Sequence, residues 1–393
     1  MKLLASLVFG GFLLLQGAES NISQPAYTVH EWGTFTSVAG KDGMALDWHP
    51  FGGPTDLPCF VHRFQIGYKA SLTGKVRMET PVIYFYTPRE MTARVRVSFP
   101  NGFITEWFPA ATQVARGIGS GSNPNTGNVS RSGVREPKRG EPDSIEWPEV
   151  KLEPGAAVHY PFEFESSHYY AARSTDSTSL SAGGEREKFL FYRGVGGFQP
   201  PVAVEYVAGD QIKLRNLAKD PLPATIVFQN ANGRVRYRSQ GPLNAEFVAE
   251  IPKDDRTVES LQQEFVRILT EQGLFPREAQ AMVETWRDSW FEEGTRVFYI
   301  VPAGEVDTIL PLTAEPRPDH IARVFVGRVE VITPETRDAI KTALKRQDVG
   351  TLEKYGRFLQ PLTGEFPASD LLGEILRKYL SLESACESGK KGW

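Results

Sequence analysis

The chain of 393 residues has little cysteine, with only Cys59 and Cys386. Two cysteines exclude a framework of several disulfides. A single bridge, two free thiols and an intermolecular bond all remain open. Cys386 lies in the polar segment ESACESGKKGW, which is expected to fray, although an oxidising compartment would permit a bridge.

The sequence also lacks an apolar run long enough for a membrane helix, which needs roughly 18 residues or more. Its most apolar stretch, Leu3 to Leu15, follows Lys2 and precedes the small residues Ala18 and Ser20. This order is typical of a cleavable secretory signal. We therefore expect a signal peptide over residues 1–20 and a secreted or periplasmic mature protein with no transmembrane span after cleavage.

The sequence also has no large excess of positive or negative charge. The 44 Lys and Arg residues nearly balance the 48 Asp and Glu residues, which leaves a formal net charge of -4. This balance argues against nucleic acid as a partner.

Familiar catalytic and nucleotide-binding signatures are absent. There is no G-x-x-x-x-G-K-[ST], G-x-S-x-G, C-x-x-C or H-E-x-x-H pattern. The segment HEWGT begins like the zinc-helix motif, but Thr34 stands where the second histidine is required. The usual hydrolase and nucleotide-binding classes are therefore disfavoured.

The remaining pattern is mainly β with an α+β C-terminal part. Short runs rich in Val, Ile, Phe, Tyr and Trp, separated by Gly and Pro turns, predict a β-rich domain over residues 21–252. Helical spacing of apolar residues follows within 253–393, together with two more strand-like runs. The sequence predicts an antiparallel β-sandwich-like body with C-terminal helices packed on it. The Gly- and Ser-rich stretch 116–144 is predicted to be a flexible loop.

Strand alternation in the early β-region places ionisable side chains among large apolar ones. In VHEWGTF, Glu31 shares a face with Val29 and His30 shares the opposite face with Trp32, so either buried face carries a titratable group. Glu79 is expected on the face of Ile83 and Phe85, and Glu106 between Ile104 and Phe108.

A buried carboxylate needs a partner. The predicted arrangement is one polar cluster that contains His30, Glu31, Glu79, Glu106 and an arginine. The candidate arginines are Arg63, Arg77, Arg173 and Arg193. Such a cluster suits acid and base chemistry, with Glu31, Glu106 and His168 as candidate catalytic residues. A structural ion-pair network, or exposure of these acids at strand ends, is the alternative.

Three of the six histidines fall close together in the sequence, namely His30, His49 and His62. Imidazoles from separate strands can converge on a divalent metal ion such as zinc. The spacing matches no established ligand motif, so local hydrogen bonding of each histidine is the competing interpretation.

The segment SSHYYAARSTDS is dense in hydrogen-bonding and aromatic groups. Tyr and Arg favour binding surfaces, and aromatic faces beside charges suit a sugar or a peptide. An ordinary strand end that runs into a polar loop is the alternative. The candidate ligand-binding residues of the chain are Trp32, Glu79, Tyr169, Tyr170, Arg173, Asp176 and Arg193.

Several longer segments resemble an uncharacterised family of secreted bacterial proteins with an N-terminal HEWGTF motif. They are HEWGTFTSVAG, METPVIYFY, SHYYAARSTD, EKFLFYRGVG and MVETWRDSWFEEGTRVFYIVP. The resemblance implies a bacterial envelope or exported location. It implies no activity, cofactor or site residue.

Together these features predict an exported bacterial envelope protein, most simply a non-catalytic binding or scaffolding β-protein whose partner is a glycan or another envelope component. The alternative is a metal-assisted hydrolase with a His/Glu cluster in the N-terminal β-region.

Overall fold

The computed structural model describes residues 27–49, 57–63, 73–114, 134–135, 142–163, 167–207 and 210–380. The predicted signal peptide, most of the predicted loop 116–144, and Cys386 lie outside the described residues. Cys59 lies within them and is disulfide-bonded.

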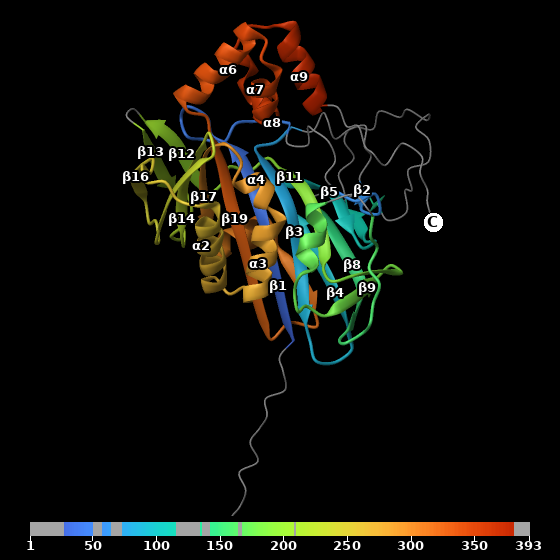
Figure 1. Ribbon diagram of the computed structural model, residues 1–393. Coiled ribbons are helices and arrows are strands. Elements are labelled where there is room, and N and C mark those ends of the chain that lie inside the picture. Colours follow the sequence, from blue (N-terminus) through green and yellow to red (C-terminus); the bar gives the residue numbers. More distant parts are fainter. Residues whose placement is uncertain are drawn as a thin grey trace, which may run out of the picture.

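One large sheet organises the described part of the chain (Figure 1). Its strand order is β15, β14, β17, β19, β1, β3, β11, β5, β2. Strand β1 lies at the centre, parallel to β19 and antiparallel to β3. The bounds are β1 Thr28–Val38, β2 His62–Arg63, β3 Val76–Tyr86, β5 Gly102–Phe108, β11 Leu190–Gly196, β14 Thr225–Ala231, β15 Arg234–Gln240, β17 Gly294–Ile300 and β19 His320–Val331.

Two smaller sheets cover one face of the large sheet, which we call the sandwich face. Side chains such as Phe35 and Phe85 share one apolar cluster with Val95, Trp147 and Ile212 of the smaller sheets. The first comprises β4 Met91–Phe99, β6 Thr112–Val114, β7 Val134–Arg135, β8 Asp143–Glu153, β9 Ser179–Ala182, β10 Glu185–Glu187 and β18 Leu312–Glu315. The second comprises β12 Val202–Val207, β13 Gln211–Asn216 and β16 Glu246–Glu250, and α5 Ala303–Ile309 joins the same cluster.

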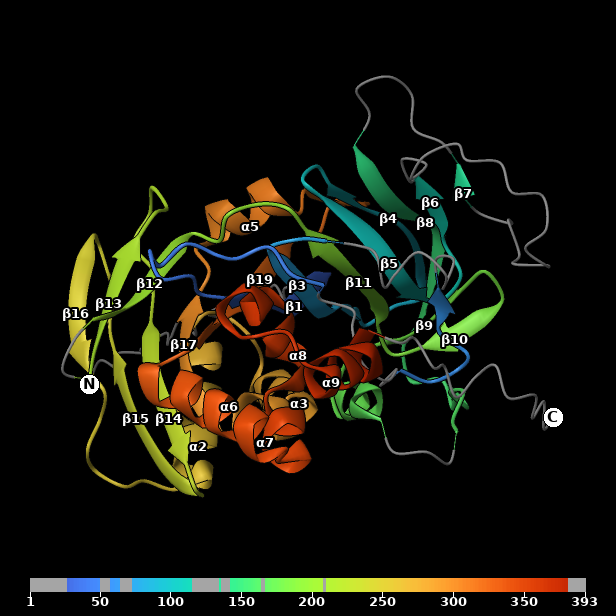
Figure 2. The same ribbon diagram turned by 90° about the horizontal axis from the view of Figure 1, so that it is seen from above.

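Helices cover the opposite face, which we call the helix face; Figure 2 shows them on the other side of the central strands from α5 and β4. They are η1 His168–Arg173, α2 Val258–Glu271, α3 Pro276–Thr285 and α4 Arg287–Trp290. Helix α2 forms because its apolar residues recur at helical spacing, so that Leu261, Phe265 and Leu269 all point at the sheet. Trp286 and Trp290 lie in the same apolar cluster and so dock α3 and α4 on the sheet.

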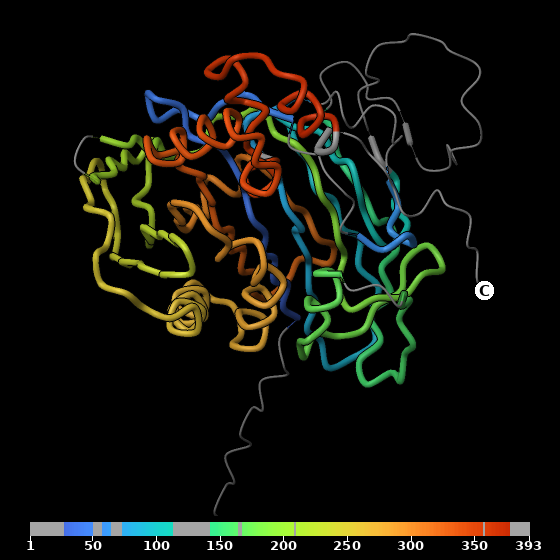
Figure 3. The backbone as a smooth tube through the Cα atoms, turned by 45° about the horizontal axis from the view of Figure 1, so that its top comes forward, coloured from blue at the N-terminus to red at the C-terminus, as the bar shows by residue number. Residues whose placement is uncertain are grey.

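The last described helices form a cap across one end of the strands (Figures 1 and 3). Their own apolar cluster includes Trp48, Val38 and Ile332 from the body. The cap contains α6 Pro334–Arg346, α7 Val349–Lys354, α8 Gly356–Leu359, η2 Gln360–Glu365 and α9 Asp370–Leu380.

The prediction of a mainly β, sandwich-like body with C-terminal helices packed on it is confirmed. Two details differ from expectation. Strands β17 and β19 lie between β14 and β1, so residues on both sides of position 252 share one sheet. The β1–β19 pair is parallel, which the long stretch of chain between the two strands permits and a hairpin would not. Within the described residues, no helix is both long and apolar enough to cross a bilayer.

Candidate functional site

Glu31 is held in a fully buried ion pair on the sandwich face of β1. Its Oε2 lies 2.6 Å from Arg323 Nε, and its Oε1 accepts a hydrogen bond of 2.5 Å from the Tyr192 hydroxyl. Arg323 also contacts Asp307 and donates to the Leu310 carbonyl. Burial, and then the charge of Glu31, raises the pKa of Tyr192 well above its usual value. Both carboxylate oxygens therefore have structural partners.

His30 belongs to a different cluster, on the helix face. Its Nδ1 lies 2.8 Å from Oε2 of Glu278 in α3. The Tyr86 hydroxyl donates to the other oxygen of Glu278 at 2.7 Å, and the Phe275 backbone donates to Oε2. Burial, and then Glu278, raises the pKa of Tyr86. The prediction that His30 and Glu31 belong to one cluster is wrong. Adjacent strand residues point to opposite faces, so His30 pairs with Glu278 on one face and Glu31 with Arg323 on the other.

The other two predicted metal ligands lie elsewhere. His62 Nε2 is 2.8 Å from Oε2 of Glu185 at the β2 edge, four strand positions from β1. Four steps at about 4.8 Å separate strands by roughly 19 Å. His49 lies beneath the cap, where its backbone donates to Gln360. The three histidines do not converge, and the described residues contain no group of three or more metal-ligating side chains.

A β-bulge in β3 moves Glu79 to the helix face. Two steps along β1, from Trp32 to Thr34, match three steps along β3, with Thr80 in the left-handed region at φ 46°. One additional residue inverts the alternation on one side of the bulge. Glu79 therefore does not share the face of Ile83, which was the expectation from period two.

A second bulge, in β5, moves Glu106 to the helix face. Arg193 pairs with Glu106 and Gly194 pairs with Ile104, so Thr105 is the additional residue. Ile104 remains on the sandwich face, whereas Glu106 shares the helix face with Phe108. The bulges of β3 and β5 flank β11 at the same level of the sheet.

These displacements assemble a row of charged side chains across the helix face, which we call the charge row. Arg193 faces Glu106 across strands, and Arg193 Nη2 lies 3.5 Å from the Thr80 hydroxyl. Arg77 Nε lies 3.5 Å from Glu79. The row as a whole contains Arg63, Glu106, Arg193, Glu79, Arg77, Arg328, Glu330 and Arg296. Glu79, Glu106 and Arg193 thus lie in this row, whereas Glu31 and His30, predicted to belong to the same cluster, do not.

The charge row ends in a network around Arg296 and Arg328, both almost fully buried. Arg296 Nε lies 2.7 Å from Glu330, and Arg328 Nη2 lies 2.9 Å from Glu292. Arg296 also donates to the Glu293 carbonyl at 3.0 Å. Two arginines and two glutamates thereby tie β17 and β19 to the turn that follows α4.

The segment SSHYYAARSTDS folds into η1 and uses its arginine internally. Arg173 Nη2 lies 2.6 Å from the fully buried Glu187, which also accepts from the Tyr169 hydroxyl. The guanidinium lies 5.0 Å from the ring centre of Tyr170 and 5.4 Å from that of Tyr160. Burial raises the pKa of Glu187, although Arg173 opposes the shift. The aromatic groups therefore surround a side chain of the protein itself.

The remaining predicted residues do not join one site. Asp176 forms an exposed ion pair with Arg277. His168 begins η1 and is partly buried, and Trp32 is fully buried in the core of the helix face.

Sequence reasoning missed Glu278, Glu187 and Arg323. Glu278 stands in the first turn of a helix, where acids are usually exposed and favoured by the helix dipole. Arg323 alternates with apolar residues in ARVFV, as an exposed strand residue would. Only the pairing of distant segments reveals that these side chains are buried.

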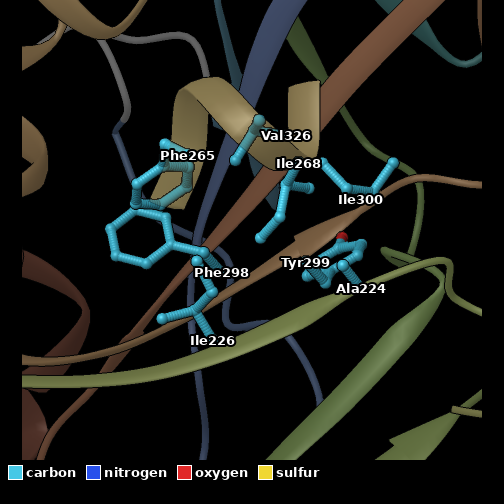
Figure 4. Close-up of a pocket in the computed structure, with 8 residues that line it drawn as sticks. All are labelled: Ala224, Ile226, Phe265, Ile268, Phe298, Tyr299, Ile300 and Val326. Atoms are coloured by element: carbon cyan, nitrogen blue, oxygen red, sulfur yellow. The ribbon is translucent and has the colours of Figure 1, made fainter. Parts of the chain in front are cut away.

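The cavities of the described residues include a small apolar one and a larger polar one. The first, between α2 and the strands β14, β17 and β19, has a volume of about 10 Å³ and is lined by apolar side chains such as Phe265, Ile268 and Phe298 (Figure 4). An apolar void of this size is a packing defect.

The second cavity, which we call the edge groove, has a volume of about 470 Å³. It lies where α6 begins, beside the end of β14 and the starts of β15 and β17. Most of its lining is polar and includes Asn230, Arg236, Glu293, Thr295, Thr333 and Tyr355.

Comparisons with known proteins show a distant structural likeness. No protein-family profile and no curated protein matches the chain. Among solved structures, the mu-homology domain of yeast delta-COP-I, complexed with a Dsl1 WxWxV peptide, is similar over 78% of this chain and 98% of that chain. The identity is 6% and the TM-score 0.28, values too low to carry an argument about function.

Proposed function

We propose that this chain is an exported bacterial envelope protein that binds or scaffolds an envelope component, such as a glycan, and catalyses no reaction. One observation carries the proposal: Glu31, the first candidate base, is fully buried and paired through both oxygens with Arg323 and Tyr192. A general base must reach the proton that it abstracts.

The other buried acids support the same function. Glu278 and Glu187 each accept bonds from three different residues within the fold. Buried ion pairs of this kind fix one arrangement of strands and helices and leave no oxygen for a substrate. A β-rich body that presents a polar groove is well suited to binding.

The test of binding uses the purified chain from Asn21 onward. We expect co-sedimentation with isolated peptidoglycan sacculi or an envelope fraction, and metal analysis below one equivalent per chain. A stoichiometric metal ion that disappears in the His30→Ala variant, together with hydrolysis of envelope material, would instead establish the metal-assisted hydrolase. Sedimentation unchanged by the presence of the envelope fraction would contradict a binding role.

The exported location has its own test. In a bacterial host, the chain should be recovered outside the cytoplasm, and N-terminal sequencing should begin at Asn21, because Ala18 and Ser20 supply small residues before the cut. Recovery of the full-length chain in the cytoplasmic fraction would contradict this part of the proposal.

A further inference from the structure

Cys59 forms its disulfide within a single chain. It lies in the exposed turn that precedes β2. The sequence contains two cysteines, Cys59 and Cys386. Within one chain, the partner of Cys59 can therefore only be Cys386.

The turn that carries Cys59 is fixed by side chains from β2 and from the segment before η1. The Cys59 backbone donates to both carboxylate oxygens of Glu163, at 2.9 and 3.0 Å. Arg63 Nη2 donates to the carbonyls of Leu57 and Pro58, at 2.8 and 3.1 Å. Hydrogen bonds to charged groups are among the stronger ones, so this turn is a firm point of attachment.

Phe60 packs the same turn against the helix face. Its ring centre lies 4.9 Å from that of Phe108 in β5 and 5.5 Å from that of Tyr169 in η1. Phe108 and Tyr169 are both almost fully buried in the cluster of the helix face. A displacement of Cys59 would therefore disturb packed aromatic side chains of the body.

Cys386 follows the last helix of the cap. Helix α9 ends at Leu380, and Cys386 stands six positions later in the sequence. Six residues reach at most about 20 Å, and the two Cα atoms of a disulfide lie about 6 Å apart. A bond between the two cysteines keeps the end of α9 within roughly 26 Å of Cys59, whatever path the intervening residues take.

The described side chains of α9 form no hydrogen bond or ion pair with the sheets. Leu372 and Ile375 pack in the cap cluster, to which Trp48 of the body contributes. Elsewhere the cap reaches the body through the partly exposed ion pair of Lys354 and Glu293, at 2.6 Å. Exposed ion pairs stabilise little, and a unit with its own small core can open locally. A covalent bond beyond α9 would limit this opening.

We infer that a Cys59–Cys386 disulfide tethers α9 of the cap to the β2 edge of the body, and that its reduction frees the cap to open. The inference goes beyond the proposed function and depends on no ligand. An oxidising compartment outside the cytoplasm would keep the bond closed.

The redox step is a thiol–disulfide exchange, and its electrons balance. One thiolate of a dithiol reagent attacks a sulfur of the bond, and the second thiol then closes the reagent's own disulfide. Cys59 and Cys386 are released as thiols and take up the two protons of the reagent. Because Cys59 is exposed, a reagent can reach the bond.

Peptide mapping without reductant tests the pairing, in the purified mature chain after incubation with oxidised glutathione. We expect one disulfide-linked pair of peptides, which contain Cys59 and Cys386, and a monomer on a non-reducing gel. Two free thiols, or a dimer that reductant separates, would overturn the inference. Neither result bears on binding to sacculi, so the proposed function is tested separately.

Hydrogen exchange tests the tether. Reduction of the wild type by dithiothreitol should accelerate exchange in α8 and α9 by about tenfold or more and leave β1 and α2 unchanged. Cys59→Ser and Cys386→Ser should each reproduce the reduced pattern and should not respond to dithiothreitol. Ser388→Ala, which keeps both cysteines, is the matched control and should exchange as the oxidised wild type does. Exchange in α9 that reduction does not change, or that rises equally in β1, would contradict the inference.

Discussion

At the scale of single residues, the molecule is defined by how it accommodates buried acids. Glu31, Glu187 and Glu278 are each fully buried, and each has an arginine, a histidine or a tyrosine as partner. An unpaired buried carboxylate costs several kcal/mol, so the folded state requires these partners. Alternation along the strand required that a buried face carry either His30 or Glu31, and both are buried because the sheet is covered on its two faces. The sequence could not identify Arg323, which is remote in the chain.

The raised pKa of Glu187 gives a pH dependence of known sign. Because the folded pKa lies above the unfolded value, the folded state takes up this proton first as the pH falls. The stabilisation is complete below the unfolded pKa and is lost as the pH rises through the folded pKa. Urea denaturation measures the free energy of unfolding of the wild type minus that of Glu187→Gln. This difference should therefore increase as the pH falls from 7 to about 4.5, because the wild type gains stability.

Glu264 supplies a control of opposite sign for this pH series. Arg267 lowers its pKa through a hydrogen bond, so its contribution is present above the unfolded pKa and is lost as the pH falls through the folded pKa. The difference between wild type and Glu264→Gln should shrink on acidification. A Glu187→Gln series that follows the same trend as Glu264→Gln would show that the pKa of Glu187 is not raised.

At the scale of elements, two β-bulges decide which acids meet. Period-two alternation predicted the strands of residues 76–86 and 102–108 well. It wrongly placed Glu79 on the face of Ile83 and Glu106 on the face of Ile104. A bulge depends on cross-strand pairing, and a threonine gives no local signal for a left-handed backbone. Alternation therefore locates strands, but a single additional residue changes which side chains share a face.

The strained position in β3 leads to a specific expectation. Thr80 has φ 46°, a conformation that costs a β-branched residue about 1 to 2 kcal/mol and costs glycine almost nothing. Relief of this strain offsets much of the lost packing, so Thr80→Gly should change the free energy of unfolding by less than about 1 kcal/mol. The matched variant Thr36→Gly, in the extended part of β1, should lose about 2 kcal/mol. Equal losses in urea denaturation would show that position 80 is not strained.

At the scale of the whole molecule, three apolar clusters organise the described chain, one on each face of the large sheet and one beneath the cap. The division expected at residue 252 followed a real change from strand to helix patterns. It could not reveal that β17 and β19 return to the centre of the first sheet, because alternation does not say which strand a segment will join. The cap, with its separate cluster, is the more independent unit.

This organisation predicts how the molecule opens locally. Trp48 packs in the cap cluster with its ring centre 6.0 Å from that of Phe358. Truncation in Trp48→Ala should cost about 3 to 5 kcal/mol and should mainly accelerate hydrogen exchange in α6 and α7. In the matched variant Trp147→Ala, at a fully buried tryptophan of the sandwich cluster, exchange should increase chiefly in β4 and β8. Identical exchange patterns in the two variants would contradict a separable cap.

The most direct test of the account is a double-mutant cycle at Glu31 and Arg323, measured by urea unfolding, with the exposed pair Glu149 and Lys151 as control. The account predicts that Glu31→Gln and Arg323→Met each lose about 3 to 5 kcal/mol, that the double variant loses much less than their sum, and that the control cycle gives less than about 1 kcal/mol. Single variants as stable as the wild type, with additive effects in the double variant, would contradict a structural role for this buried pair.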